Sequence, residues 1–196
     1  MSLESAIWVL AIANFFVYIV RYAVLDWGPT LLGEWKGVSI HHAGWMVAAF
    51  EISGIVGMLV AGWATDRFFG GRGPRVCVIC MALATVFVAL FWGISQPPMW
   101  LATLLLGAAG FCIYGPQALV GIAAANIATK KAAATAVGFT GLFGYASTLV
   151  SGWGLGLLAQ HYGWNIAVGA LILIAIMGTL IFMAAWSAKA NGYDND

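Results

Sequence analysis

Six apolar stretches, each close to the length of a membrane-crossing helix, take up nearly the whole chain. A helix needs about 20 predominantly apolar residues to cross the hydrocarbon core of a bilayer. The stretches are residues 6–30, 43–64, 76–94, 100–128, 132–159 and 164–186. Because only 8% of the residues are charged, the chain cannot cover a water-facing surface with polar groups. We therefore predict an all-α integral membrane protein, a single domain over 1–196 with six transmembrane helices and no soluble domain.

Basic residues are concentrated on one set of the predicted connections. These are Arg67, Arg72, Arg75, Lys130, Lys131 and Lys189, whereas the opposite set contains only Lys36. Since Lys and Arg accumulate in cytoplasmic loops, both termini are predicted to be cytoplasmic. The first stretch is predicted to stay in the membrane, because MSLES lacks the basic region of a cleavable signal peptide.

Three ionisable side chains lie within the apolar stretches: Arg21, Asp26 and Glu51. Such a group costs about 3 kcal/mol at membrane depth and is retained where it is paired or functional. Two acids and one base leave one acid in excess. We therefore expect Glu51, in the middle of its span, to pair with a cation from another membrane unit. We expect the same kind of partner for Asp26. Alternatively, Asp26 reaches interfacial water, because it is near the end of its span.

One face of the first predicted helix is polar and aromatic. Asn14, Tyr18, Arg21 and Tyr22 fall on this face, which we expect to line a cavity. Arginine suits anion binding there, because its guanidinium stays charged and its planar fork matches phosphate oxygens. Asp26 lies about 140° round the helix, so it is not expected to neutralise Arg21. Arg21, Tyr18 and Asn14 are thus candidate substrate-binding residues.

The fourth and fifth spans contain features of moving or closely packed helices. Tyr114, Gly115 and Pro116 are predicted to interrupt the fourth span and give a kinked, cavity-lining helix, although the kink could be purely structural. In the fifth span, every fourth residue from Ala132 to Gly156 is Ala, Thr or Gly. This stripe predicts close helix packing or a sliding surface, and Tyr145 beside it could reach the cavity.

Several other functions are not supported by the sequence. The sequence contains no phosphate-binding loop after a strand, no catalytic set of Ser, His and Asp, and no basic surface for nucleic acid. We therefore predict neither an enzyme nor a nucleic-acid partner. Cys77 and Cys80 form a CxxC inside an apolar span without a nearby third ligand. They are interpreted as buried thiols, and no metal or cofactor is expected.

The connection GWATDRFFGGRGPR, residues 62–75, resembles the G-x-x-x-D-[RK]-x-G-[RK] loop of the major facilitator superfamily, with an extra residue before its glycine pair. In that superfamily the acid and bases of the loop brace neighbouring helix ends. The resemblance implies a bracing and gating role for Asp66 and Arg67.

Three further segments make the resemblance more specific. YIVRYAVLDWGPT at 18–30, IYGPQALVG at 113–121 and KKAAATAVGFTGLFGY at 130–145 resemble the carboxy-terminal half of the organophosphate:phosphate antiporter family. That family has twelve spans in two six-helix halves. The resemblance implies one half of a major facilitator fold in a bacterial inner membrane, with a missing amino-terminal half as partner.

The resemblance also implies roles for individual residues. Arg21 matches one of two arginines that hold the substrate phosphate, and the cavity tyrosines match Tyr18, Tyr114 and Tyr145. The acids that match Asp26 and Glu51 form ion pairs between the two halves.

The function implied is exchange of an organic phosphate, such as hexose 6-phosphate or glycerol 3-phosphate, for inorganic phosphate. A sugar-phosphate sensor using the same cavity is an alternative, and an assembly module without a ligand is another. The sequence leaves all three open.

Overall fold

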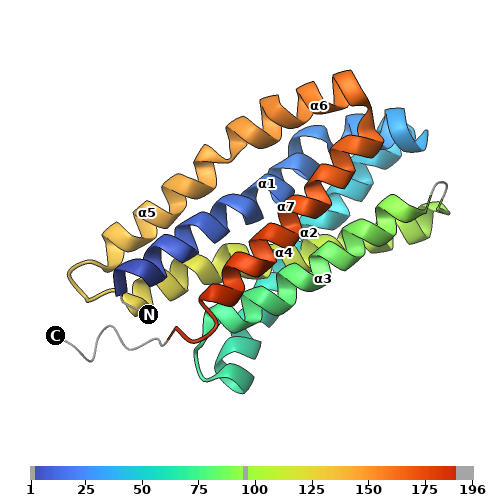
Figure 1. Ribbon diagram of the computed structural model, residues 1–196. Helices are drawn as coiled ribbons and strands as arrows, with labels where there is room; N and C mark the ends of the chain where they lie inside the picture. The colour runs from blue at the N-terminus through green and yellow to red at the C-terminus, as the bar shows by residue number, and fades with distance from the viewer. Residues whose placement is uncertain (1–2, 95–96, 189–196) are drawn as a thin grey trace.

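The computed structural model describes residues 3–94 and 97–188, and every regular element in these ranges is helical. The elements are α1 (Leu3–Lys36), α2 (Ile40–Phe69), α3 (Gly73–Gly93), α4 (Met99–Ile127), α5 (Ala133–Ala146), η1 (Val150–Gly154), α6 (Leu155–Tyr162) and α7 (Trp164–Ala184). Six segments are long and apolar enough to cross a membrane, the fifth being Ala133–Tyr162. They form one bundle in which α1 starts and α7 ends at the same end (Figure 1). The predicted all-α, six-helix membrane fold is confirmed.

The first two helices are longer than the sequence predicted. α1 continues to Lys36 and α2 extends to Phe69, so only Gly37–Ser39 connects them. Gly37 takes φ +68°, a left-handed conformation that favours glycine, and Ser39 caps α2 by accepting a hydrogen bond from the His42 backbone N–H. At the other end, Asp66 and Arg67 lie in the last turns of α2 rather than in the following connection, which corrects their predicted position.

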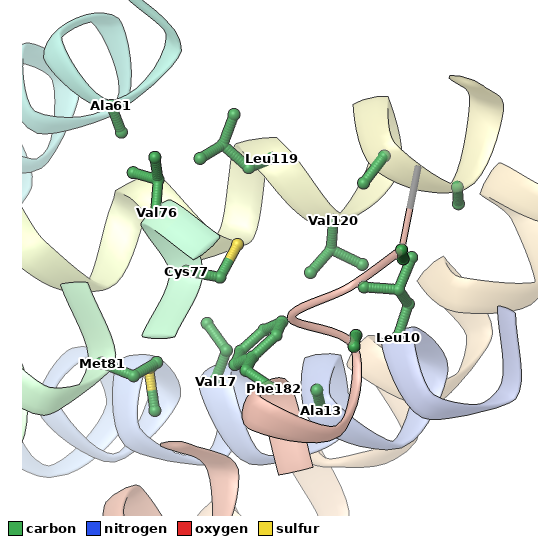
Figure 2. Close-up of a cluster of buried hydrophobic side chains, with 14 of the residues drawn as sticks. Leu10, Ala13, Val17, Ala61, Val76, Cys77, Met81, Leu119, Val120 and Phe182 are labelled. Carbon is green, nitrogen blue, oxygen red and sulfur yellow. The ribbon is translucent and has the colours of Figure 1, made fainter. Parts of the chain in front are cut away.

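Buried side chains from four helices meet near the end of the bundle where the chain starts. Leu10 and Val17 of α1, Met81 of α3, Val120 of α4 and Phe182 of α7 form this cluster (Figure 2). All three cysteines are free thiols, and of the two CxxC residues Cys77 is buried as predicted whereas Cys80 is only partly buried. Lipid tails are as apolar as these side chains, so tight packing rather than exclusion of water stabilises the cluster.

Helices α2 and α4 approach each other closely at glycines. A Cβ added at Gly57 would run into the backbone of Phe111, and one added at Gly110 would run into the backbone of Phe50. The Tyr114 ring lies against Gly54. Because Glu51 is one turn before Gly54 on α2, this packing places Glu51 next to Tyr114.

The predicted interruption of the fourth span is not found, and the irregular segment lies in the fifth span. α4 continues through Pro116, whereas the fifth span passes through a turn at Ser147 into the π-helical η1. The Ser147 hydroxyl donates to the Gly144 carbonyl at 2.6 Å, an arrangement that competes with the regular helical bonds. The Trp27 indole N–H is shared between the carbonyls of Ser151 and Gly152, at 3.1 and 3.0 Å, which ties α1 to η1.

Candidate functional site

An arginine, a glutamate and a tyrosine from three helices meet in the interior of the bundle. Arg21 of α1 places Nη2 3.6 Å from Glu51 Oε2 of α2. The Arg21 guanidinium carbon lies 4.6 Å from the centre of the Tyr114 ring of α4, an arrangement that favours the cation. Only 16% of the Arg21 side chain and 31% of the Glu51 side chain are exposed. The contact between the two charges is longer than a hydrogen bond, so Glu51 only partly satisfies the guanidinium.

Arg21, Glu51 and Tyr114 form the first level of the site. A second level lies one helical turn before Arg21, toward the start of α1. Tyr18 lies beside Tyr145 of α5, with ring centres 5.9 Å apart, and beside Tyr22 at 5.7 Å. The side-chain amide of Gln117, one turn after Tyr114 on α4, is next to the Tyr18 hydroxyl. Tyr145 is 63% exposed on the side of α5 that no other described helix covers. This level therefore combines hydroxyl and amide groups without a net charge.

The third level is formed by Asn14 and the fifth span. Asn14 is buried and its Nδ2 donates to the Thr140 carbonyl at 2.9 Å. Gly144 leaves room for this level, because a Cβ added there would lie 2.9 Å from Asn14 Nδ2 and 3.3 Å from the Tyr18 ring. The small-residue stripe of the fifth span thus packs against the polar face of α1.

Unpartnered polar atoms in the described residues are concentrated at these three levels. Buried side-chain atoms without a hydrogen-bond partner are Asn14 Oδ1, Arg21 Nε, Glu51 Oε1, Tyr114 Oη and Gln117 Oε1. The Tyr114 hydroxyl lies near Arg21 and Glu51 without meeting hydrogen-bond geometry. An unsatisfied buried polar atom costs about 1–3 kcal/mol, so these five atoms are available for hydrogen bonds to a ligand or to water.

The structure brings together six of the nine predicted site residues. Those together are Asn14, Tyr18, Arg21, Glu51, Tyr114 and Tyr145. Asp26 is exposed and forms no ion pair with Arg21, as its position across the helix predicted, while its pairing with another membrane unit stays a prediction. Asp66 and Arg67 are also exposed and form no ion pair with other described residues. Asp66 lines a separate cavity of about 390 Å³ with Gly71 and Asn126 at the far end of α2.

Glu51 contacts a cation of its own chain, which the sequence analysis did not expect, while its pairing with a further cation from another membrane unit stays a prediction. The sequence suggested a cation outside this chain, but Arg21 of the same chain is 3.6 Å away. The two residues are 30 positions apart and on different helices, so helical periodicity alone gives no information on this contact. The excess acid in the spans is therefore Asp26 and not Glu51.

The sequence analysis missed Gln117. The sequence could have identified it, because Gln117 is an amide in the middle of an apolar span. It follows Tyr114 by three residues, so both side chains lie on one face of α4. No group of three His, Cys, Asp or Glu side chains suited to a metal occurs in the described part of the chain. The site is therefore a set of hydrogen-bonding groups around one cation.

Known proteins are similar to this chain over most of its length. The profile of the Major Facilitator Superfamily matches residues 10–192. The chain is 40% identical to a probable hexose phosphate transport protein of Chlamydia pneumoniae over 93% of its length, covering 40% of that protein. It is 36% identical to a glycerol-3-phosphate transporter of Haemophilus influenzae, covering 95% of the chain and 43% of the relative.

A third relative is the membrane sensor protein UhpC of Salmonella typhimurium. The identity is 33%, and the match covers 96% of this chain and 42% of the relative. The chain thus spans about 40% of the length of the relatives that it matches.

Proposed function

The chain belongs to the Major Facilitator Superfamily, and we propose that it is the carboxy-terminal six-helix half of a secondary transporter for organic phosphates. In this proposal an organic phosphate such as hexose 6-phosphate or glycerol 3-phosphate is exchanged for inorganic phosphate by alternating access. The missing partner is an amino-terminal six-helix half. Support for the substrate class comes from the names of two relatives, a hexose phosphate transport protein and a glycerol-3-phosphate transporter.

The observation that carries the proposal is the unsatisfied guanidinium of Arg21. Arg21 Nε is buried without a partner, and its nearest acid is at 3.6 Å. A phosphate can accept two parallel hydrogen bonds from a guanidinium, which a distant carboxylate does not replace. With Tyr18 one turn away and Tyr114 against the guanidinium, the site suits a phosphoryl group at this level.

The membrane and the orientation belong to the same proposal. We place the chain in a bacterial inner membrane with both termini cytoplasmic. This orientation is supported by Arg72 and Arg75 between α2 and α3, and by Lys130 and Lys131 between α4 and α5. These connections lie at the end of the bundle where α1 starts (Figure 1).

A sensor is the second candidate, because one relative is named as a membrane sensor protein. A sensor would bind the sugar phosphate in the same cavity without needing to move it across the membrane. Uptake of labelled hexose 6-phosphate by proteoliposomes containing both halves separates the two candidates, since only the transporter accumulates label.

The test of phosphate binding is the change Arg21→Lys. The chain is placed in a phosphorus-free amphipathic polymer, and weak binding is followed by broadening of the ³¹P NMR lines of inorganic phosphate and glucose 6-phosphate. Lysine keeps the charge but loses the fork, so we expect affinity for both ligands to fall about tenfold or more. Arg72→Lys, outside the site, is the matched control and should bind as the wild type does.

If Arg21 only tethers α1 to α2 through Glu51, lysine should serve nearly as well. Wild-type broadening in Arg21→Lys would therefore overturn the assignment of Arg21 as the phosphate-binding residue.

A further inference from the structure

We propose that Gln117 binds the organic part of the substrate and so distinguishes an organic phosphate from inorganic phosphate. The inference rests on the proposed function and adds a specificity-determining residue to the same site. Gln117 follows Tyr114 by one helical turn on α4, and its amide lies beside the Tyr18 hydroxyl. The Gln117 Oε1 atom is buried and has no hydrogen-bond partner. It is thus a free acceptor adjacent to the level that holds Arg21.

The unpartnered atoms differ between the levels of the site. The Arg21 level has a free donor, Arg21 Nε, together with the free Tyr114 hydroxyl and Glu51 Oε1, whereas the free groups on Gln117 and Asn14 are amide oxygens, which can only accept. Phosphate oxygens are acceptors, so phosphate suits the guanidinium but not the amide oxygens. Sugar and polyol hydroxyls can donate to an amide oxygen. The site is therefore matched to a molecule with an anionic group at one end and hydroxyls at the other.

The spacing of the levels agrees with such a molecule. Along α1, Tyr18 is three residues from Arg21 and Asn14 is seven, which correspond to about 4.5 and 10.5 Å of helix. A phosphate bound at Arg21 does not span these distances. A carbon skeleton attached to the phosphate extends toward the Tyr18 and Gln117 level, and a longer skeleton extends further toward Asn14. The Gln117 amide is then the first acceptor that the organic part meets.

The experiment compares Gln117→Leu with the wild type in the ³¹P NMR assay. Leucine has a similar volume but no polar group. We expect affinity for glucose 6-phosphate to fall about two- to tenfold, as for the loss of one neutral hydrogen bond, and affinity for inorganic phosphate to stay unchanged. Gln160→Leu, an exposed position on α6, is the matched control and should bind both ligands as the wild type does.

A series of monodeoxy glucose 6-phosphates identifies the contact. The analogue that lacks the hydroxyl donating to Gln117 should bind wild type and Gln117→Leu equally, while the other analogues should retain the difference. If Gln117 merely supports Tyr18, the variant should instead weaken both ligands in parallel.

The outcomes separate this inference from the proposed function. Equal affinities of wild type and Gln117→Leu for glucose 6-phosphate, or parallel losses for both ligands, would overturn the role of Gln117 while leaving the phosphate site in place. Absence of binding of either ligand to the wild-type chain assembled with an amino-terminal six-helix half would overturn the proposed function and this inference with it.

Discussion

Arg21 and Glu51 are the charged pair of the candidate site. The two charges are 3.6 Å apart and mostly buried, so their attraction is stronger than that of a surface pair. The carboxylate of Glu51 also competes with an incoming phosphate for the same guanidinium. Under the proposed function, the affinity for phosphate would therefore depend on the balance between Glu51, the internal anion, and the bound phosphate, the external anion.

The change Glu51→Gln tests this balance. It removes the competing negative charge, so we expect affinity for inorganic phosphate to rise by about 1 kcal/mol, or roughly fivefold. The measurement is a titration followed by ³¹P line broadening, with Glu4→Gln outside the site as control. A fall in affinity would mean that Glu51 contacts the bound phosphate directly or holds Arg21 in its binding conformation.

Residue types and helical spacing were sufficient to predict much of this site. Asn14, Tyr18 and Arg21 are on one helix, so their common face follows from a period of 3.6 residues. Tyr114 and Tyr145 were noted from the patterns of the fourth and fifth spans, and the resemblance to a family assigned them to the substrate cavity. The Arg21–Glu51 contact and the position of Gln117 depend on how α1, α2 and α4 pack, and single-helix periodicity contains no information on packing between helices.

At the scale of the elements, the contact between α2 and α4 holds Glu51 opposite Tyr114. Gly57 and Gly110 allow the two backbones to approach without side chains between them. Hydropathy predicted both helices, because the length of an apolar stretch is a local property of the sequence. It could not predict which pair packs most closely. Hydropathy also could not predict that the fifth span, which has no proline, is irregular while α4 continues through Pro116. The irregular segment involves hydrogen bonds of the Ser147 hydroxyl and the Trp27 indole, which hydropathy does not describe.

The substitution Gly57→Ala should destabilise the bundle. The added Cβ meets the backbone of Phe111, which cannot rotate away, so α2 and α4 must separate. Overpacking of this kind costs about 1–3 kcal/mol and should lower the unfolding temperature of the purified chain by several degrees. Gly62→Ala is the matched control on the same helix, because a Cβ there meets nothing within 4 Å. Equal unfolding temperatures for the two variants would show that α2 and α4 do not pack as described.

At the scale of the whole molecule, the candidate site is open on one side. The Tyr145 residue is 63% exposed and the Glu51 side chain 31% exposed, although both belong to the candidate site. The relatives are longer than this chain by more than a factor of two, since the matches cover only 40–43% of them. In transporters built from two related halves, the substrate site lies between the halves and alternating access comes from one half rocking against the other.

The last prediction concerns the chain without a partner. We expect it to insert as six helices but not to exchange phosphate, because one half can neither close the site nor alternate its access. The measurement is uptake of ³²P-labelled phosphate into proteoliposomes loaded with unlabelled phosphate, with the chain reconstituted alone or together with an amino-terminal six-helix half. Exchange should appear only in the second case, and Arg21→Lys should reduce it. Exchange by the chain alone, with cross-linking showing a monomer, would contradict the requirement for a second half. Exchange that depends on a dimer of this chain would show that a second copy can take the place of the partner, with one Arg21 contributed by each copy.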